Sequence, residues 1–147
     1  ERLDIWQLVD DVVRQANVDT DRLVFSRPEA PLIMDVRPLS IRRAIDNLVS
    51  NGLRYANHVW VSGNINQKTV QIHVEDDGPG IPEDKVKDAL KPFARLDAAR
   101  NQNFGTGAGL GLPIVADIAH AHGGQLELFR SKTLGGLRAT FSLGLKK

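Results

Sequence analysis

Two asparagines stand one helical turn apart on the polar side of a predicted helix. Asn47 and Asn51 share that side with Arg43 and Arg54, because these positions recur at helical spacing. Amide oxygens, completed by water, are suitable ligands for Mg²⁺. Arg54 could contact a phosphate, and Tyr55 at the end of the helix could pack against a base. Taken singly, each of these residues is more often part of an ordinary solvated helix face.

An aspartate and two glycines directly follow the clearest predicted strand. In the segment Asp76-x-Gly78-x-Gly80, the carboxylate can accept a hydrogen bond from an exocyclic amine, and the glycines allow a tight turn beneath a flat base. Such a charge-assisted bond contributes roughly 1.5–3 kcal/mol, enough to select adenine over guanine. An ordinary Asp-Gly turn explains the same residues, and for this segment alone it is the preferred interpretation.

Glycines alternate at positions 105, 107, 109 and 111, directly before a predicted helix. Such a backbone can approach a ligand closely, and it presents consecutive N–H donors beside the positive end of the helix. The segment is therefore suited to phosphate, although a flexible hinge would use the same residues. Other nucleotide motifs are excluded, because the chain has no G-x-x-x-x-G-K-[ST], no G-x-G-x-x-G after a first strand, and no H-R-D or D-F-G.

The elements that must position these residues follow from hydrophobic periodicity. Apolar residues at helical spacing predict a helix over 5–16, capped by Asp4 with Gln7 in capping-box register. The remaining expected elements are strands at 23–26 and 32–36, a helix from Pro38 to about Asn57, a hairpin of strands at 59–62 and 70–75 with its turn at 64–68, a helical turn at 84–91, a helix that follows the glycines and is ended by Gly123-Gly124, and strands at 125–129 and 137–143. This order predicts one antiparallel-rich mixed sheet covered by helices on one face.

Composition sets limits on the class of protein. The 147 residues fit one domain, and the absence of cysteine excludes disulfide scaffolds and thiolate sites. A formal charge of +1 gives no basic excess for nucleic acid, and no apolar run approaches the ~20 residues that span a bilayer. We therefore expect no nucleic-acid partner and no direct membrane contact. Because a helix pattern begins almost at once after Glu1, we interpret the chain as a piece of a longer protein.

Four ordered motifs together resemble those of one family, the bacterial sensor histidine kinases. The motifs are Asn47-Leu-Val-Ser-Asn51-Gly-Leu-Arg54-Tyr55 (similar to the N box), Asp76-Asp77-Gly78-Pro79-Gly80-Ile81 (the G1 box), Lys91-Pro92-Phe93-Ala94-Arg95 (the F box) and Gly107-Ala108-Gly109-Leu110-Gly111-Leu112 (the G2 box). The resemblance covers essentially the whole chain. It implies an α/β (α+β) two-layer sandwich of the Bergerat type, in which a five-stranded, mainly antiparallel mixed sheet carries three helices on one face and a long ATP lid.

The resemblance also implies a ligand and a set of site residues. Residues 1–147 would be the catalytic ATP-binding domain, without the phosphoacceptor and sensor domains, and would bind ATP with Mg²⁺. Asn51 would ligate the metal with help from Asn47, Asp76 would read the adenine amine, and Arg54 and Arg95 would face phosphates. The implied catalytic residues are Asn47, Asn51 and Arg54. The implied nucleotide-binding residues are Asn51, Gly52, Leu53, Arg54, Tyr55, Asp76, Gly78, Gly80, Ile81, Arg95, Leu96, Gly107, Ala108, Gly109, Leu110, Gly111 and Leu112.

Three positions depart from the family pattern. Gly52 replaces the usual alanine, Pro113 falls in what we expect to be the first turn of the last helix, and Gly105-Thr106 precedes the G2 box. The additional pair leaves the register of the lid open by two residues.

The same fold serves ATPases of the gyrase, Hsp90 and MutL group, in which a glutamate one turn before the metal asparagine activates water. Here that position is Asn47, and an amide cannot take a proton from water as a carboxylate can. A kinase is therefore favoured over such an ATPase. A non-catalytic nucleotide-binding switch is the other alternative.

None of the four histidines is expected to accept the phosphoryl group. His58 and His73 occupy strand positions, with His73 on the polar face of its hairpin, and His120 and His122 point in different directions on a helix. No H-E-x-x-[ST]-P segment occurs. We therefore expect the chain to bind ATP without phosphorylating itself. By resemblance, its partners would be the histidine phosphoacceptor (dimerisation) domain of the same kinase and an OmpR-like response regulator, and it would be the cytoplasmic portion of an inner-membrane sensor kinase.

Overall fold

The computed structural model describes residues 1–90 and 105–145, and for residues 105–110 it describes the backbone alone. Its main sheet has five strands in the order β2-β4-β5-β7-β6. Their bounds are Leu23–Ser26 (β2), Val59–Asn66 (β4), Thr69–Asp76 (β5), Leu126–Arg130 (β6) and Leu137–Gly144 (β7). β2 runs parallel to β4, whereas the other neighbouring pairs are antiparallel, so the predicted mixed, mainly antiparallel sheet is confirmed.

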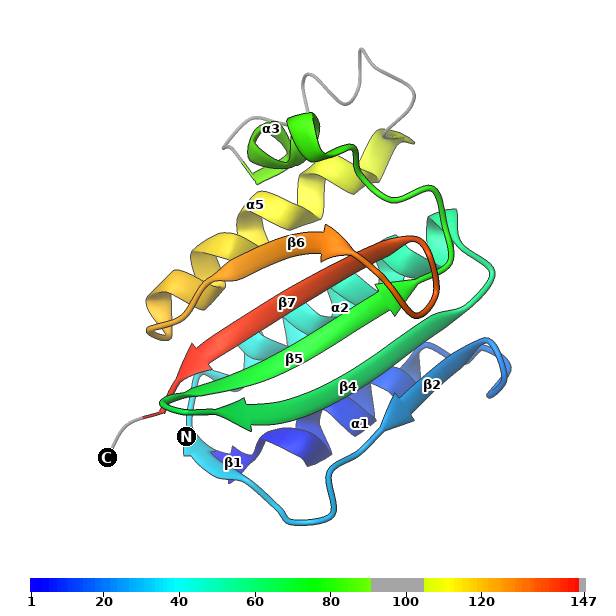
Figure 1. The fold of residues 1–147 in the computed structure, drawn as a ribbon. Coiled ribbons are helices and arrows are strands. Elements are labelled where there is room, and N and C mark those ends of the chain that lie inside the picture. The colour runs from blue at the N-terminus through cyan, green and yellow to red at the C-terminus, as the bar shows by residue number, and fades with distance from the viewer. Residues whose placement is uncertain (91–104, 146–147) are drawn as a thin grey trace.

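Three long helices cover one face of this sheet, as Figure 1 shows. They are α1 (Ile5–Gln15), α2 (Pro38–Tyr55) and α5 (Gly105–Ala121). The core lies between the two layers, where Ile45 of α2, Ile72 of β5 and Phe141 of β7 are fully buried. Burying such side chains contributes roughly 1.5–3 kcal/mol each, which stabilises the packing of helices on the sheet. The predicted two-layer sandwich is therefore confirmed.

The N-terminal helix is capped as predicted only in part. Asp4 Oδ1 accepts a hydrogen bond from the Trp6 N–H at 3.1 Å, which begins α1 at the predicted place. Gln7 does not complete a capping box, because its Oε1 accepts a hydrogen bond from Arg27 Nη1 at 3.0 Å, while its Nε2 donates to Asp11 Oδ1 at 2.8 Å. A strand absent from the prediction, β1 (Arg2–Asp4), pairs with β3 (Ile33–Asp35) in a separate two-stranded sheet. Three residues are too few to show a strand periodicity.

The β4–β5 hairpin is tighter than predicted. Asn64 to Asn66 remain in β4, and the ladder continues to the pair Asn66 and Thr69, so only two residues form the turn. Gln67 has a φ of 56°, a left-handed conformation that two-residue hairpin turns require. The polar residues at this end are exposed, and composition alone therefore made them resemble a loop.

The last helix begins earlier than predicted. Helical backbone starts at Gly105 and runs through the alternating glycines to Ala121. Pro113 consequently lies inside α5 and not in its first turn, where it removes one backbone hydrogen bond. The predicted end is confirmed, because Gly123 adopts a φ of 78° and the Gly124 N–H donates to the Ala119 carbonyl. A short helical turn, η1 (Glu83–Lys85) and α3 (Val86–Leu90), occupies the predicted region before residue 91.

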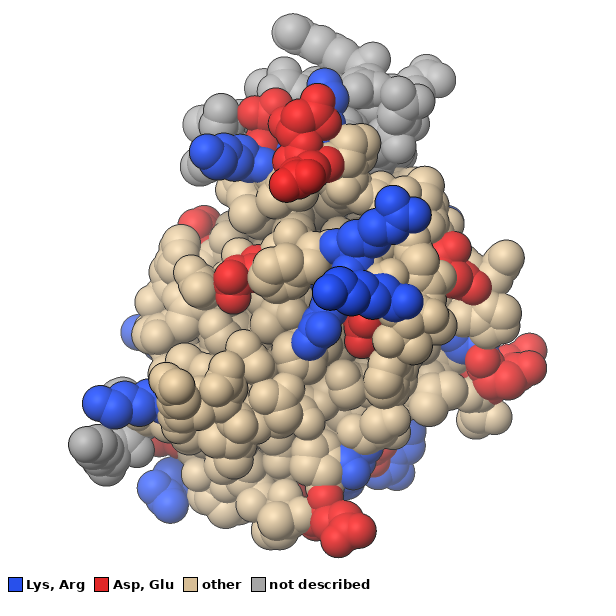
Figure 2. Space-filling model, in the orientation of Figure 1, with Lys and Arg blue, Asp and Glu red and all other residues tan. Residues whose placement is uncertain are grey.

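The second face of the sheet carries no helix in the described part of the chain. Figure 2 shows this face as largely uncharged, with Lys and Arg side chains gathered over the β6–β7 end. Across residues 1–90 and 105–145, no helix combines the length and the apolar character that crossing a membrane requires.

Candidate functional site

The end of β5 meets α2 on the helix-covered side of the sheet. Val70, Ile72 and Val74 face the core, and by strand alternation Asp76 follows on the same side. Asp76 Oδ2 lies 3.7 Å from the position that a β-carbon on Gly52 would occupy. The N-box helix and the G1-box aspartate, 24 residues apart in the chain, are thereby neighbours.

Asp76 is a buried carboxylate with one oxygen already committed. Its Oδ1 accepts the Gly78 N–H at 2.9 Å and the Leu137 N–H at 3.1 Å. Its Oδ2 accepts no hydrogen bond from the described residues, although Asp76 as a whole is only 6% exposed. A carboxylate oxygen that accepts no hydrogen bond is available to a donor such as an exocyclic amine.

The electrostatics of Asp76 follow from the same contacts. Burial raises the pKa of this carboxyl above its usual value, and the backbone hydrogen bonds from Gly78 and Leu137 oppose that rise. The charged form is therefore costly in the free protein. A hydrogen-bond donor that reaches Oδ2 would relieve part of this cost.

The turn after β5 is built on the neighbouring aspartate. Asp77 Oδ1 accepts the N–H groups of Asn57 and His58 at 2.8 and 2.9 Å, and its Oδ2 lies 2.7 Å from His58 Nδ1. The hydrogen bonds from His58 are the main reason that the pKa of Asp77 is lowered. The two adjacent carboxylates thus have opposite environments: Asp77 joins the α2–β4 connection to the turn, while Asp76 keeps one oxygen unpaired.

The glycines of the turn allow close packing. A β-carbon at Gly78 would lie 2.8 Å from the Tyr55 carbonyl oxygen, and Gly80 has a φ of 72°. Gly78 thus lets the turn pack against the end of α2, and Gly80 lies beside Gly136 of the β6–β7 connection. The predicted need for glycine at these two positions therefore has a structural basis.

The paired asparagines occupy different environments on α2. Asn51 Oδ1 is buried and has no hydrogen-bond partner among the described residues. Asn47 lies against α5, because a β-carbon on Gly111 would be 3.3 Å from Asn47 Cβ. An orphaned buried amide oxygen is costly unless a ligand completes it, so Asn51 fits a role as a Mg²⁺ ligand. No cluster of three or more His, Cys, Asp or Glu suited to a metal exists within the described ranges.

Other predicted site residues are placed only in part. Leu53 is half-buried and packs against the core cluster, Arg54 is exposed, and Tyr55 is half-buried at the end of α2. Ile81 packs partly on the core, and Leu112 is buried in α5. Arg95, Leu96 and the rest of the F box lie outside the described residues. Of Gly107, Ala108, Gly109 and Leu110, only the helical backbone is described.

Two contacts around the site were not predicted. Arg22, in the turn before β2, donates from Nη2 to the Leu53 and Ala56 carbonyls at 2.5 and 3.1 Å and from Nε to the Asn57 carbonyl at 3.2 Å. It thereby satisfies the open carbonyls at the end of the N-box helix. No sequence signal marks Arg22, because its partners lie more than 30 residues away. The second contact is the β6–β7 connection, whose Gly136 N–H donates to the Asp76 carbonyl at 3.0 Å.

His73 lies on the open face of the sheet, as its predicted polar position implied, but it is only 4% exposed. Its Nε2 lies 2.6 Å from Asn64 Oδ1 and its Nδ1 lies 2.9 Å from Thr140 Oγ1. Burial, together with the Arg138 guanidinium, lowers the pKa of His73 to about 4. His73 is a neutral packing residue and not an accessible nucleophile.

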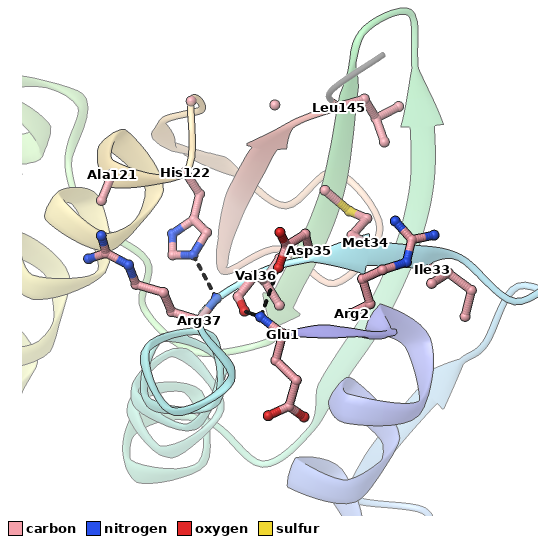
Figure 3. Close-up of a pocket in the computed structure, with 12 residues that line it drawn as sticks. Glu1, Arg2, Ile33, Met34, Asp35, Val36, Arg37, Ala121, His122 and Leu145 are labelled. Carbon is pink, nitrogen blue, oxygen red and sulfur yellow. Dashed lines mark hydrogen bonds and ion pairs between the residues drawn. The ribbon is translucent and has the colours of Figure 1, made fainter.

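A cavity of about 700 Å³ lies at the opposite end of the sheet from Asp76. Figure 3 shows that it lies beside the β1–β3 pair, and its lining includes Met34, Val36, His122 and Leu145. His122 is already engaged, because its Nδ1 donates to the Ile118 carbonyl at 2.9 Å and its Nε2 accepts the Arg37 N–H at 3.3 Å. Among the described residues of the four motifs, none lines this cavity, so it is separate from the candidate nucleotide site.

Comparisons with known proteins bear on the whole chain. The model of a family described as histidine kinase-, DNA gyrase B- and HSP90-like ATPases matches residues 36–147. Sensor histidine kinase CpxA of Escherichia coli K12 is 34% identical over 145 residues, which are 97% of this chain and 31% of that protein. Sensor protein RstB of Escherichia coli K12 is 43% identical over 103 residues, 69% of this chain and 23% of that protein. The chain therefore spans between about a fifth and a third of the length of such curated relatives.

Solved structures agree on the fold. The crystal structure of the ATP binding domain of PrrB from Mycobacterium tuberculosis has a TM-score of 0.79 at 26% identity, covering 100% of this chain and 98% of that one. The NMR structure of the histidine kinase domain of the E. coli osmosensor EnvZ has a TM-score of 0.75 at 34% identity, covering 100% of this chain and 89% of that one.

Proposed function

Because the chain belongs to the family of histidine kinase-, DNA gyrase B- and HSP90-like ATPases, we propose that it is the ATP-binding catalytic domain of a sensor histidine kinase. The observation that carries this proposal is that two side-chain oxygens, on β5 and on α2, each lack a hydrogen-bond partner among the described residues. Asp76 Oδ2 is open to an adenine amine, and Asn51 Oδ1 on the adjacent helix is buried without a partner. One oxygen would select the base, and the other would hold Mg²⁺ beside the triphosphate.

The residue one turn before Asn51 favours transfer over hydrolysis. Asn47 offers an amide, which cannot act as the general base that a water nucleophile needs. The γ-phosphoryl group would instead go to the imidazole nitrogen of a histidine on a separate dimerisation domain. That nitrogen forms a bond to the γ-phosphorus, the bond to the β–γ bridging oxygen breaks, and ADP leaves with its electron pair. Mg²⁺, when bound, would reduce the negative charge on the phosphate oxygens.

The rest of the site would bind and orient the nucleotide. Gly78 and Gly80 would let the turn lie under the base, and Arg54 with Arg95 would face the phosphates. The backbone of residues 107–112 would wrap the triphosphate, with Gly52, Leu53, Tyr55, Ile81 and Leu96 completing the pocket. The parent protein would be an inner-membrane sensor with this domain in the cytoplasm. Its response regulator would be OmpR-like.

Isothermal titration of ATP, with and without Mg²⁺, tests the proposal on the chain as it stands. The wild type should bind in a Mg²⁺-dependent manner, and Asp76→Asn should bind at least tenfold more weakly, since a charge-assisted hydrogen bond contributes roughly 1.5–3 kcal/mol. Asn51→Ala should lose the Mg²⁺ dependence, while the exposed helix variant Asp46→Asn serves as a matched control. Absence of ATP binding to a well-folded wild type would leave a protein-binding switch as the function.

Phosphotransfer separates the kinase from its alternatives. With a histidine-bearing dimerisation domain added, radiolabelled phosphate should appear on that domain and not on this chain. Steady release of inorganic phosphate without a partner would instead indicate an ATPase. A stable phosphohistidine on the isolated chain would contradict the expectation that none of its own histidines is the acceptor.

A further inference from the structure

The β6–β7 connection is fastened to the strand that carries Asp76. Ser131, which is 1% exposed, donates from Oγ to Glu75 Oε1 at 3.0 Å and accepts the Leu134 N–H at 3.0 Å. Within the connection, the Ser131 N–H donates to the Gly136 carbonyl at 2.7 Å. Glu75 is itself buried and takes no part in the proposed chemistry. The loop is therefore closed on itself, and the hydrogen bond between Ser131 and Glu75 links it to β5.

The end of the same connection contacts Asp76 directly. The Gly136 N–H donates to the Asp76 carbonyl, and the Leu137 N–H donates to Asp76 Oδ1 at 3.1 Å. A β-carbon at Gly136 would lie 2.5 Å from the Asp76 carbonyl oxygen and 2.6 Å from the Gly78 nitrogen, nearer than real β-carbons approach. Glycine is thus required for this approach, and the approach brings the Leu137 N–H to the carboxylate.

The two donors on Oδ1 come from different parts of the chain. Gly78 belongs to the same turn as Asp76, whereas Leu137 follows the β6–β7 connection as the first residue of β7, which pairs with β5 from Arg138 onward. Together they hold the carboxylate with Oδ2 toward Gly52 of α2. A hydrogen bond is strongly directional, so the orientation of Oδ2 decides how well an exocyclic amine is recognised.

We propose that Ser131 and Glu75 are positioning residues for base selection: their hydrogen bond holds the β6–β7 connection so that the Leu137 N–H fixes the orientation of the Asp76 carboxylate. This inference rests on the proposed function, in which Asp76 reads the adenine amine. Neither Ser131 nor Glu75 touches the nucleotide in this account. Both act through the backbone of Gly136 and Leu137.

The readout is the ratio of affinities for ATP and ITP, the analogue with a carbonyl in place of the amine. A purely structural role for Ser131 would weaken both nucleotides equally. A positioning role affects only the hydrogen bond that ATP makes and ITP cannot. The ratio therefore separates the two roles in one experiment.

The experiment is titration of Mg²⁺-ATP and Mg²⁺-ITP into the wild type and four variants, each checked for folding by thermal unfolding. The wild type should prefer ATP, and Ser131→Ala and Glu75→Ala should each reduce the preference by about tenfold. Glu75→Gln keeps an acceptor oxygen for Ser131 and should retain the ratio. Ser142→Ala is the matched control, because among the described residues the hydroxyl of this buried serine bonds only to Gln125, near the opposite end of β7 from Leu137.

Each outcome decides a separate point. A wild type that binds neither nucleotide overturns the proposed function, and the positioning role with it. A wild type that prefers ATP, with the preference unchanged in Ser131→Ala and Glu75→Ala, overturns the positioning role alone. Loss of the fold in both alanine variants would make the bond structural and would also overturn it.

Discussion

The end of β5 and the beginning of α5 supply the two halves of the candidate site by opposite means. Asp76 is held by hydrogen bonds from Gly78, Gly136 and Leu137, all within a packed part of the sheet. The first turns of α5 carry four glycines, and Pro113 lies further along inside the helix. Each helical glycine costs about 1 kcal/mol relative to alanine, and an interior proline costs about 3 kcal/mol. The base-recognition half is preorganised, whereas the expected phosphate-binding half has weak local helix stability.

The same substitution should therefore have opposite effects in the two regions. Gly136→Ala should lower the free energy of unfolding by about 3 kcal/mol, because the new methyl group overlaps the Asp76 and Gly78 backbone. Chemical denaturation measures this change. Gly135→Ala is the neighbouring control: its β-carbon would meet nothing within 4 Å, although its φ of 90° adds some strain. Equal losses for both variants would contradict the packing argument.

The burial of His73 on the open face of β5 should make the free energy of unfolding depend on pH. The folded pKa of His73, about 4, is lower than the ordinary 6.5, so protons bind the unfolded state more readily. Stability is then fully present above about pH 6.5 and is lost as pH falls toward 4, by about 2 kcal/mol between pH 7 and pH 5. His73→Gln should flatten the curve of unfolding free energy over this window. An unchanged slope would show that other groups cause the acid sensitivity.

In α5, Gly107→Ala should raise the free energy of unfolding by up to about 1 kcal/mol, because it favours the helix over other backbone conformations. The same change should weaken Mg²⁺-ATP binding if residues 107–112 must leave the helix to wrap the triphosphate. Denaturation and titration on the same protein measure both quantities. Ala108→Gly is the matched reverse substitution and should lower stability by a similar amount. ATP binding that is unaffected by Gly107→Ala would contradict the phosphate-binding prediction for this segment.

The smallest effects should distinguish the two adjacent aspartates. The pKa of Asp76 is raised in the folded protein, so stability is lost as pH rises from the ordinary value through the raised one. The charged carboxylate therefore opposes folding at neutral pH, and Asp76→Asn should raise Tm there. The lowered pKa of Asp77 means the reverse: its contribution is present above the ordinary value and is lost in acid, so Asp77→Asn should lower Tm. Scanning calorimetry at neutral pH gives both signs. A common sign would contradict the contrast between the two environments.

Much of the fold could be predicted because its signals are local. The apolar periodicities of α1 and α2, the alternation in β4 and β5, and the glycine stop at Gly123 each depend on residues within a few positions. The predictions that failed concern features that a short window of sequence does not show. β1 is three residues long, the side-chain oxygen of Gln7 binds Arg27 and does not complete the capping box, and α5 starts within glycines that local preference assigns to a loop.

The candidate site likewise has features that the sequence shows and features that form only on folding. The spacing of Asn47 and Asn51, the segment Asp76-x-Gly78-x-Gly80 and the absence of a glutamate at position 47 are properties of the sequence, and they determined the chemistry that we propose. The amide that fixes Asp76, the arginine that caps the N-box helix and the charge that helps to lower the pKa of His73 come from residues that meet their partners only on folding: Leu137, Arg22 and Arg138. Tertiary structure decides these features because a backbone N–H or a change in solvation leaves no trace in residue type. Its effect exists only where distant segments meet.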